Sequence, residues 1–304
     1  MDIRELRPPV DDGPWPLVTH HPPISSDGVR GARSWTGLTY ALVRGYRPLV
    51  LDLHVPRDAD APSPLVVWVH GGGWMEGDRR YVPLEWPQQA LFEKLVAAGM
   101  AVATVDYRLL EEAPFPACVH DCVAAVRYLR RYAVELGLDP ARVAVWGESA
   151  GAQLAAMVAF LGTDPHADET LLGRVGVGGG EVGVSAAVLY YGPDTLDQLV
   201  DDLADADGDG LAWFGGSRRT LDLMAPAAHV HPAAPPVLLV HGSEDGVVGV
   251  DHSERLHAAL RSVGVDSTLE VVERVDHCFV GTSVVPILDR TVDFLAERLG
   301  STRR

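Results

Sequence analysis

The stretch RVAVWGESAGAQLA, residues 142–155, decides how the rest of this 304-residue chain can be interpreted. Residues 142–146 form a mainly apolar run that is typical of a buried strand, whereas residues 150–161 predict a helix. Between them, residues 147–151 have the pattern Gly-x-Ser-x-Gly, and the two glycines allow a turn that a Cβ would crowd. A strand, a sharp turn carrying a serine and a helix form the context of a nucleophile elbow, so Ser149 is predicted to be a nucleophile.

A second motif, HGGGW at residues 70–74, follows the apolar run at 65–69. Successive glycines allow the backbone amides of Gly72 and Gly73 to point at a substrate oxygen, and the amide of Ala150 would join them from the start of the helix. Preorganised donors of this kind stabilise the oxyanion that forms during acyl transfer. The sequence therefore predicts an oxyanion hole made by these three amides.

A serine nucleophile needs a neighbouring base and a carboxylate that orients the base. In a sheet of this type these residues follow the order serine, acid, histidine along the chain. His277 lies just after the last expected strand, in the sequence VDHCF, and is the predicted base. Asp245 follows another expected strand and is the predicted acid, with Glu244 as the alternative. His241 is expected to support the backbone, and His252 is expected on the surface of a helix.

Apolar runs and helical periodicities alternate over most of the chain, which predicts an α/β fold with a mostly parallel, doubly wound sheet flanked by helices. Strands are expected at residues 34–44, 49–55, 65–69, 100–105, 142–146, 185–191, 236–240 and 268–272. Helices are expected at residues 85–98, 116–136, 150–161, 251–263 and 284–299. Residues 1–34 are predicted to be an irregular N-terminal arm, and residues 35–304 a single catalytic domain with an insertion at about 192–235.

The bulk properties limit the partners. A formal net charge of −17 argues against binding to nucleic acid or to an anionic membrane. We find neither a secretory h-region nor a run of about 20 apolar residues that could span a membrane. Cys118 and Cys122 have the spacing of buried free thiols on a helix, so a reduced, cytoplasmic location is expected. The chain could form a homodimer.

An acidic stretch at residues 201–210 is a weak candidate for a metal site. Asp205, Asp207 and Asp209 match the start of a calcium-binding loop, but Gly216 occupies the twelfth position, where a bidentate glutamate is needed. We therefore predict a solvated acidic loop, with no metal and no cofactor in the protein.

Seven segments together carry a family resemblance. They are LDLHVP at 51–56, HGGGW at 70–74, VDYRL at 105–109, PFPACVHDC at 114–122, GESAGAQLA at 147–155, HGSEDGVV at 241–248 and VDHCF at 275–279. In these segments the chain resembles the α/β-hydrolase superfamily, and specifically the hormone-sensitive-lipase-like carboxylesterases and their acetyl- and feruloyl-esterase relatives. The resemblance implies a cofactor-independent serine carboxylesterase that acts on a small-molecule ester through an acyl-enzyme intermediate.

The pocket is expected to accept short acyl chains, because the aromatic residues near the site are scattered and no long apolar lid is evident. Trp74, Tyr107, Tyr191 and Trp213 are the residues expected to contact the substrate. The HGGGW motif and the continuation of the elbow through Gln153 also resemble aryl-formamidases, so an amidase is an alternative. A catalytically silent binding protein and an interfacial lipase are two further alternatives.

Overall fold

The computed structural model describes residues 24–26, 28–43, 47–80, 82–197 and 217–301, together with the single positions 3, 6, 45 and 214. The strands are β1 (Ile24–Ser26), β2 (Ala32–Ala41), β3 (Leu49–Pro56), β4 (Ser63–Val69), β5 (Ala101–Val105), β6 (Leu138–Glu148), β7 (Ala186–Tyr190), β8 (Val237–Gly242) and β9 (Ser267–Val272). The helices are α1 (Ala90–Ala97), α2 (Ala117–Arg131), α3 (Ala133–Leu136), α4 (Ala150–Thr163), α5 (Glu169–Leu172), α8 (Arg218–Met224), α9 (Asp251–Ser262) and α10 (Val285–Leu299). Two 3-10 turns, η2 (Pro226–His229) and η3 (His277–Phe279), complete the described elements.

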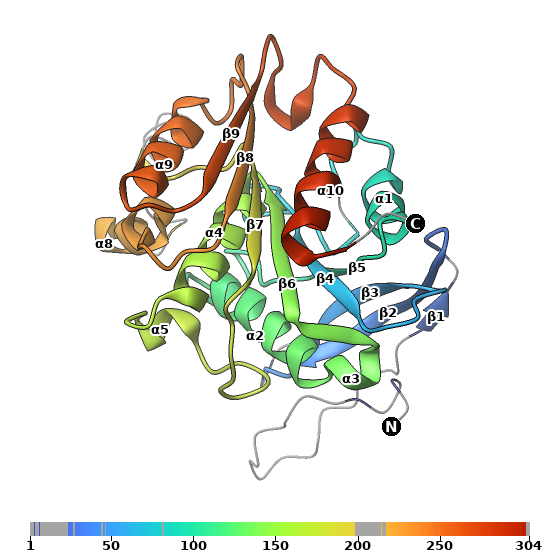
Figure 1. The fold of residues 1–304 in the computed structure, drawn as a ribbon. Coiled ribbons are helices and arrows are strands. Elements are labelled where there is room, and N and C mark those ends of the chain that lie inside the picture. Colours follow the sequence, from blue (N-terminus) through green and yellow to red (C-terminus); the bar gives the residue numbers. More distant parts are fainter. Residues whose placement is uncertain are drawn as a thin grey trace.

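The described strands form one sheet in the order β1-β2-β3-β5-β4-β6-β7-β8-β9. The strands β1, β2, β3 and β5 pair antiparallel, and all pairs from β5 to β9 are parallel. The predicted α/β fold with a mostly parallel, doubly wound sheet is thus confirmed. The parallel strands β4 to β9 all end at the same edge of the sheet, at the top of Figure 1.

Each face of the sheet buries a separate apolar core, because side chains alternate between the two faces along a strand. In β4, Leu65, Val67 and Val69 face the core that contains α2, α4 and α9. Val66 and Trp68 face the core that contains α1 and α10. Figure 1 shows these two layers of helices on opposite sides of the sheet. With both faces covered, the central strands are apolar throughout, which is why the sequence shows them as continuous hydrophobic runs.

Several expected boundaries differ from the structure. The irregular arm predicted for residues 1–34 is wrong at its C-terminal end, because β1 pairs antiparallel with β2 and β2 begins at Ala32. The helix expected from residue 85 begins at Ala90, after Pro87, whose carbonyl accepts the Ala90 amide. The long helix expected over residues 116–136 is divided into α2 and α3 at Tyr132.

One buried ion pair joins the segment after β5 to α2. The Asp121 side chain is 0% exposed. Its carboxylate accepts three hydrogen bonds from Arg108, from the backbone amide, Nε and Nη2, at 2.7–2.8 Å. Arg108 follows the carboxyl end of β5. In sheets of this type, binding and catalytic sites form at the edge that holds the carboxyl ends of the parallel strands. The ion pair therefore fixes a loop on that edge to the helical layer beneath it.

We expect Asp121→Asn to lower the free energy of unfolding by about 3 kcal/mol, because removing one partner leaves a poorly compensated guanidinium in the interior. Denaturant titration followed by far-ultraviolet circular dichroism measures this loss. The matched control is Arg80→Ala, which breaks the exposed pair with Asp78 and is expected to change the stability by less than about 1 kcal/mol. Equal losses in the two variants would contradict the structural role given to the buried pair.

Candidate active site

Ser149 lies on a sharp turn between β6 and α4. Its backbone angles, φ 52° and ψ −123°, are strained for a residue with a side chain. The turn closes because its two glycines leave room for the backbone: a Cβ on Gly147 would lie 2.1 Å from the Gly151 carbonyl oxygen, and a Cβ on Gly151 would lie 2.2 Å from the Val69 carbonyl oxygen. The predicted elbow is therefore present, and it packs directly against the end of β4.

Ser149, His277 and Asp245 are joined by hydrogen bonds. Nε2 of His277 lies 3.1 Å from Oγ of Ser149, and Nδ1 of His277 lies 2.8 Å from Oδ2 of Asp245. The three residues come from the end of β6, from η3 and from the loop after β8. The structure thus brings together the three residues that the sequence analysis named, and the alternative acid Glu244 is exposed on the same loop.

The Asp245 carboxylate is held by more than its histidine partner. Oδ1 accepts the amides of Val247 and Val248 at 2.9 and 2.8 Å, and Nε2 of His241 lies 3.2 Å from Oδ2. Burial by itself would raise the pKa of Asp245, but the hydrogen bonds from His241, His277 and the Val248 amide outweigh it and hold the pKa well below its usual range. The carboxylate is therefore ionised and fixed in orientation.

His241 is wholly buried, and Nε2 donates to the Val248 carbonyl at 2.7 Å. The expected backbone-supporting role of His241 is confirmed, and its contact with Asp245 adds a second function that the sequence did not suggest. Another residue that the sequence analysis missed is Asp276. Its Oδ1 accepts the amides of Gly246 and His277 at 2.9 and 2.7 Å, and these bonds lower its pKa. Asp276 therefore ties the acid loop to the histidine loop.

The HGGGW loop is supported from below by Tyr107. Its ring stacks on the His70 ring with the centroids 4.4 Å apart, and its hydroxyl donates to the carbonyls of His70 and Gly71 at 3.0 and 3.2 Å. Ala150 opens α4, where the first amides of a helix have no acceptor within the helix. Gly72, Gly73 and Ala150 all line the cavity in front of Ser149, as an oxyanion hole at this place would require.

A cavity of about 450 Å³ opens in front of Ser149. Its described wall consists of Gly72, Gly73, Trp74, Met75, Glu76, Glu148, Ser149, Ala150, Pro193, Val247, Val248, His277 and Cys278. The wall contains two acidic residues, and no lysine or arginine is among the described lining residues. Met75, Glu76 and Val247 were not predicted to line the cavity, although Met75 and Glu76 directly follow HGGGW and Val247 lies within the recognised segment HGSEDGVV.

Trp74, Tyr107, Tyr191 and Trp213 were expected to contact the substrate. Trp74 lines the cavity, but its indole is 5% exposed and its Nε1 donates to Gln153. The expectation is wrong for Tyr107 and Tyr191, which are at most 1% exposed and are not part of the described wall. Tyr191 instead packs edge-on against the His277 ring, with the centroids 4.7 Å apart. Trp213 lies outside the described residues.

Another expectation is wrong for His252, which was predicted on the surface of a helix. It is 2% exposed, and its Nδ1 lies 2.6 Å from Oδ1 of Asp194, which also pairs with Arg255. The pattern of α9 alone could not show this, because the carboxylate comes from the segment that follows β7. These three residues fasten that segment to α9 and have a structural role.

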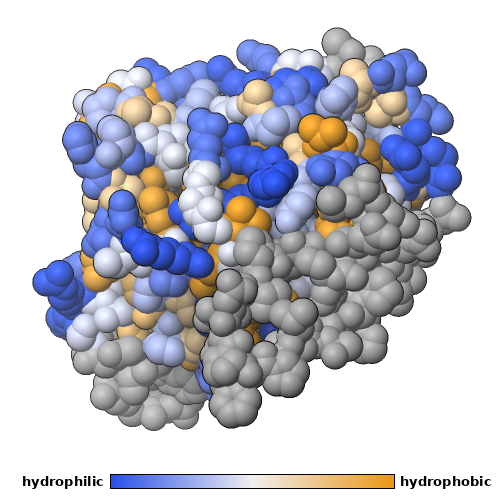
Figure 2. All heavy atoms as spheres, turned by 90° about the horizontal axis from the view of Figure 1, so that it is seen from below, coloured by the Kyte–Doolittle hydropathy of each residue, from blue (hydrophilic) through white to orange (hydrophobic). Residues whose placement is uncertain are grey.

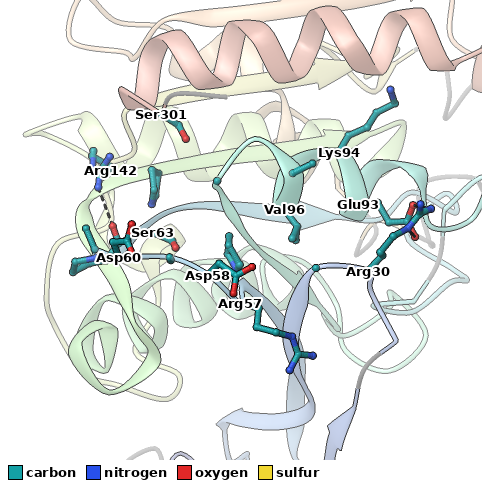
Figure 3. Close-up of a pocket in the computed structure, with 18 of the residues that line it drawn as sticks. Arg30, Arg57, Asp58, Asp60, Ser63, Glu93, Lys94, Val96, Arg142 and Ser301 are labelled. Carbon is teal, nitrogen blue, oxygen red and sulfur yellow. Dashed lines mark hydrogen bonds and ion pairs between the residues drawn. The ribbon is translucent and has the colours of Figure 1, made fainter. Parts of the chain in front are cut away.

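Figure 3 shows a second cavity, of about 710 Å³. Its lining includes Ser63, at the amino end of β4, whereas Ser149 follows the carboxyl end of the parallel strand β6, so the two cavities lie at opposite edges of the sheet. The second cavity is bounded by the loop between β3 and β4, by α1 and by Ser301. The charged groups labelled there are engaged with protein atoms: Arg30 pairs with Glu93 at 2.7 Å and Arg142 donates to the Pro62 carbonyl at 3.0 Å. Figure 2, which views the molecule from below, shows mostly hydrophilic residues with scattered apolar ones over its described part.

The described residues contain no group of three or more histidine, cysteine, aspartate or glutamate side chains that could hold a metal ion. Within the same residues, no helix is both long and apolar enough to cross a lipid bilayer. Cys118 and Cys122 are buried free thiols, as expected. The acidic stretch at 201–210 lies outside the described residues, and the expected assembly state and cell compartment remain predictions.

The sheet order, the two helical layers and the serine elbow define an α/β-hydrolase fold. Solved structures agree on the fold. A truncated carbohydrate esterase from gut microbiota has a TM-score of 0.76 at 22% identity, covering 91% of this chain and 100% of that one. Esterase 2 of Thermogutta terrifontis, in its propionate-bound form, has a TM-score of 0.67 at 22% identity over 90% of this chain and 97% of that one.

The chain belongs to the BD-FAE family, whose model matches residues 51–260. A carboxylesterase of Mycobacterium tuberculosis, NlhH, is 39% identical over 130 residues, which are 43% of this chain and 37% of the relative. The esterase LipI of the same species is 31% identical over 247 residues, which are 74% of this chain and 69% of the relative. The alignments span less than half the length of NlhH and of another relative, LipQ. The resemblance stated from the sequence motifs is confirmed.

We expect Asp245→Asn to lower kcat on an activated ester by a factor on the order of 10⁴, because an amide would favour the wrong tautomer of His277. Steady-state kinetics on the purified variant measure the loss. Glu244→Gln is the matched control on the same loop and should stay within about twofold of the original protein. The reverse result would transfer the role of the acid to Glu244.

Proposed function

We propose that this protein is a serine carboxylesterase that hydrolyses short-chain acyl esters. The observation that carries the proposal is the series of hydrogen bonds from Asp245 through His277 to Ser149. Ser149 and His277 line a cavity whose wall also includes residues of the HGGGW loop. Relatives that are named esterases support the same activity.

In the first half of the reaction, Oγ of Ser149 attacks the ester carbonyl while Nε2 of His277 accepts the serine proton. Asp245 holds the imidazole by its Nδ1–H and stabilises the positive charge that forms on the ring. The carbonyl oxygen becomes an oxyanion, which the amides of Gly72, Gly73 and Ala150 receive. Collapse of this intermediate breaks the bond to the alkoxy oxygen, and His277 returns the proton to the departing alcohol.

In the second half, a water molecule attacks the acyl-serine carbonyl, and His277 accepts a proton from it. The second tetrahedral intermediate collapses to release the carboxylic acid, and Ser149 regains its proton. Nothing in this cycle requires a metal or an organic cofactor, because one histidine performs both proton transfers. The buried contacts of Asp245 support the cycle, since they keep the imidazole in one orientation.

The preference for short acyl chains follows from the walls of the cavity. Each buried methylene contributes about 0.8 kcal/mol, provided that a continuous apolar surface receives it. Here the described wall combines the exposed apolar side chains Met75 and Val247 with the exposed carboxylate Glu76, so the apolar surface is not continuous. A long acyl chain would therefore meet a charged and wet surface beyond its first few carbons.

We expect kcat/KM on p-nitrophenyl esters to be highest between about two and six acyl carbons and to fall towards palmitate. A fluorophosphonate should label the protein with a stoichiometry near one, and Ser149→Ala should abolish both the labelling and the turnover. A kcat/KM that climbs steadily beyond ten carbons would support a lipase instead. Faster turnover of N-formyl aryl amides than of the matched esters would support an amidase, and absence of labelling would support a silent binding protein.

Because the described wall of the cavity is acidic, we also expect the enzyme to discriminate against negatively charged esters. We compare 4-nitrophenyl pentanoate with the mono-4-nitrophenyl ester of glutaric acid, because their five-carbon acyl chains end in a methyl group and in a carboxylate respectively. The anionic ester should have a kcat/KM about tenfold lower, since the exposed Glu76 carboxylate repels its carboxylate, and added salt should narrow the difference. The Glu76→Gln variant should also narrow it, whereas an unchanged ratio would contradict the repulsion.

A further inference from the structure

Glu148 precedes the nucleophile, and its carboxyl group is 1% exposed at the end of β6. Oε1 accepts the amide hydrogen of Gly71 at 2.6 Å. Gly71 is the first glycine of the HGGGW loop and immediately precedes Gly72. The carboxyl group therefore joins the nucleophile elbow to the loop that carries the proposed oxyanion donors, across 77 residues of sequence.

The contact is tight as well as directional. A Cβ added to Gly71 would lie 2.3 Å from Oε1 of Glu148, and the next two nearest atoms are Cδ and Oε2 of the same side chain, both at 2.7 Å. No residue with a side chain could replace Gly71 without displacing the Glu148 carboxyl group. The loop thus rests directly on Glu148, and the carboxyl group sets how closely Gly71 can approach the elbow.

Burying a carboxyl group in this environment costs free energy, because the ionised form loses its contact with water. Burial raises the pKa of Glu148 to about 7, although the hydrogen bond from the Gly71 amide and the nearby His277 favour the ionised form. Cys278, a further neighbour, has its own pKa raised by burial to about 12 and is therefore an uncharged thiol. Among the described residues, no arginine or lysine side chain acts on Glu148, so no ion pair with them offsets the cost of burying its carboxyl group.

We propose that Glu148 is a positioning residue for acyl transfer, which holds the Gly72 and Gly73 amides in place through its hydrogen bond to Gly71. The proposal rests on the proposed esterase function. Displacing a donor from the developing oxyanion costs far more than losing a surface contact, because the donors stabilise a negative charge that forms only in the transition state. The effect of Glu148 should therefore fall on the transition state and leave substrate binding nearly unchanged.

The first test compares Glu148→Ala and Glu148→Gln with the original protein on p-nitrophenyl butyrate. We expect kcat to fall about 100-fold in the alanine variant and about tenfold in the glutamine variant, whose amide oxygen can still accept the Gly71 amide, with KM within about threefold. A trifluoromethyl ketone, which forms a tetrahedral oxyanion with the serine, should lose affinity in parallel with kcat. The matched control is Glu181→Gln, an exposed residue far from the cavity, which should change neither quantity.

The second test is a double-mutant cycle with Gly71→Ala. In the original protein the added methyl group collides with the Glu148 carboxyl, so this substitution alone should lower kcat by at least tenfold. In the Glu148→Ala background the obstructing atoms are gone, so adding Gly71→Ala should cost less than about twofold. Strict additivity of the two substitutions would overturn the proposed contact, because uncoupled residues give independent effects.

A protein without esterase activity and an esterase in which Glu148 has no positioning role would give different results. If the original protein neither hydrolyses esters nor reacts with a fluorophosphonate, the proposed function fails. If it does both, and Glu148→Ala keeps the original kcat and inhibitor affinity, only the positioning role of Glu148 fails. A variant with low kcat but unchanged affinity for the trifluoromethyl ketone would also overturn the inference, since its oxyanion donors would be intact.

Discussion

The close approach of two backbone segments underlies the rest of the site. The elbow that carries Ser149 presses against the end of β4, and the space that a Cβ would need at Gly151 is already filled by the carbonyls of Val69 and His70. Because these segments touch, the loop after β4 and the start of α4 face the same small volume. The serine and the proposed oxyanion donors can then act on a single carbonyl group. Parallel pairing of β4 with β6 sets this distance before any side chain contributes.

Two carboxyl groups border this volume, and their surroundings differ. Asp245 accepts two backbone amides and lies beside two histidines, and its pKa is lowered. Glu148 accepts one backbone amide, no arginine or lysine within the described part of the chain acts on it, and burial raises its pKa to about 7. Environments that separate the pKa values of neighbouring acids are a common means of giving them different roles. Here one acid orients the histidine, and the other supports the loop across the cavity.

The fold and the hydrogen-bonded residues could be predicted because their signals are local. An apolar strand, a glycine-flanked serine and a following helix occupy consecutive positions, and Asp245 and His277 each come directly after a strand. What the sequence could not show depends on distant segments. The Glu148 contact with Gly71 spans 77 residues, and the burial of His252 depends on Asp194. Tyr107 and Tyr191 follow the carboxyl ends of β5 and β7, where residues of the site are expected. Whether such a ring lines the cavity or packs behind it depends on tertiary packing, which the sequence does not show.

The burial of Glu148 also links folding to proton uptake. In an unfolded chain this carboxyl group would titrate at its ordinary value of 4.5, whereas in the folded protein its pKa is about 7. Between these two values the folded state binds a proton at Glu148 that the unfolded state has released. By linkage, this residue favours the folded state most at the acidic end of that interval, and its contribution declines as the pH rises to about 7. The burial of Glu148 that allows its hydrogen bond to Gly71 therefore lowers the free energy of unfolding at neutral pH relative to pH 4.5.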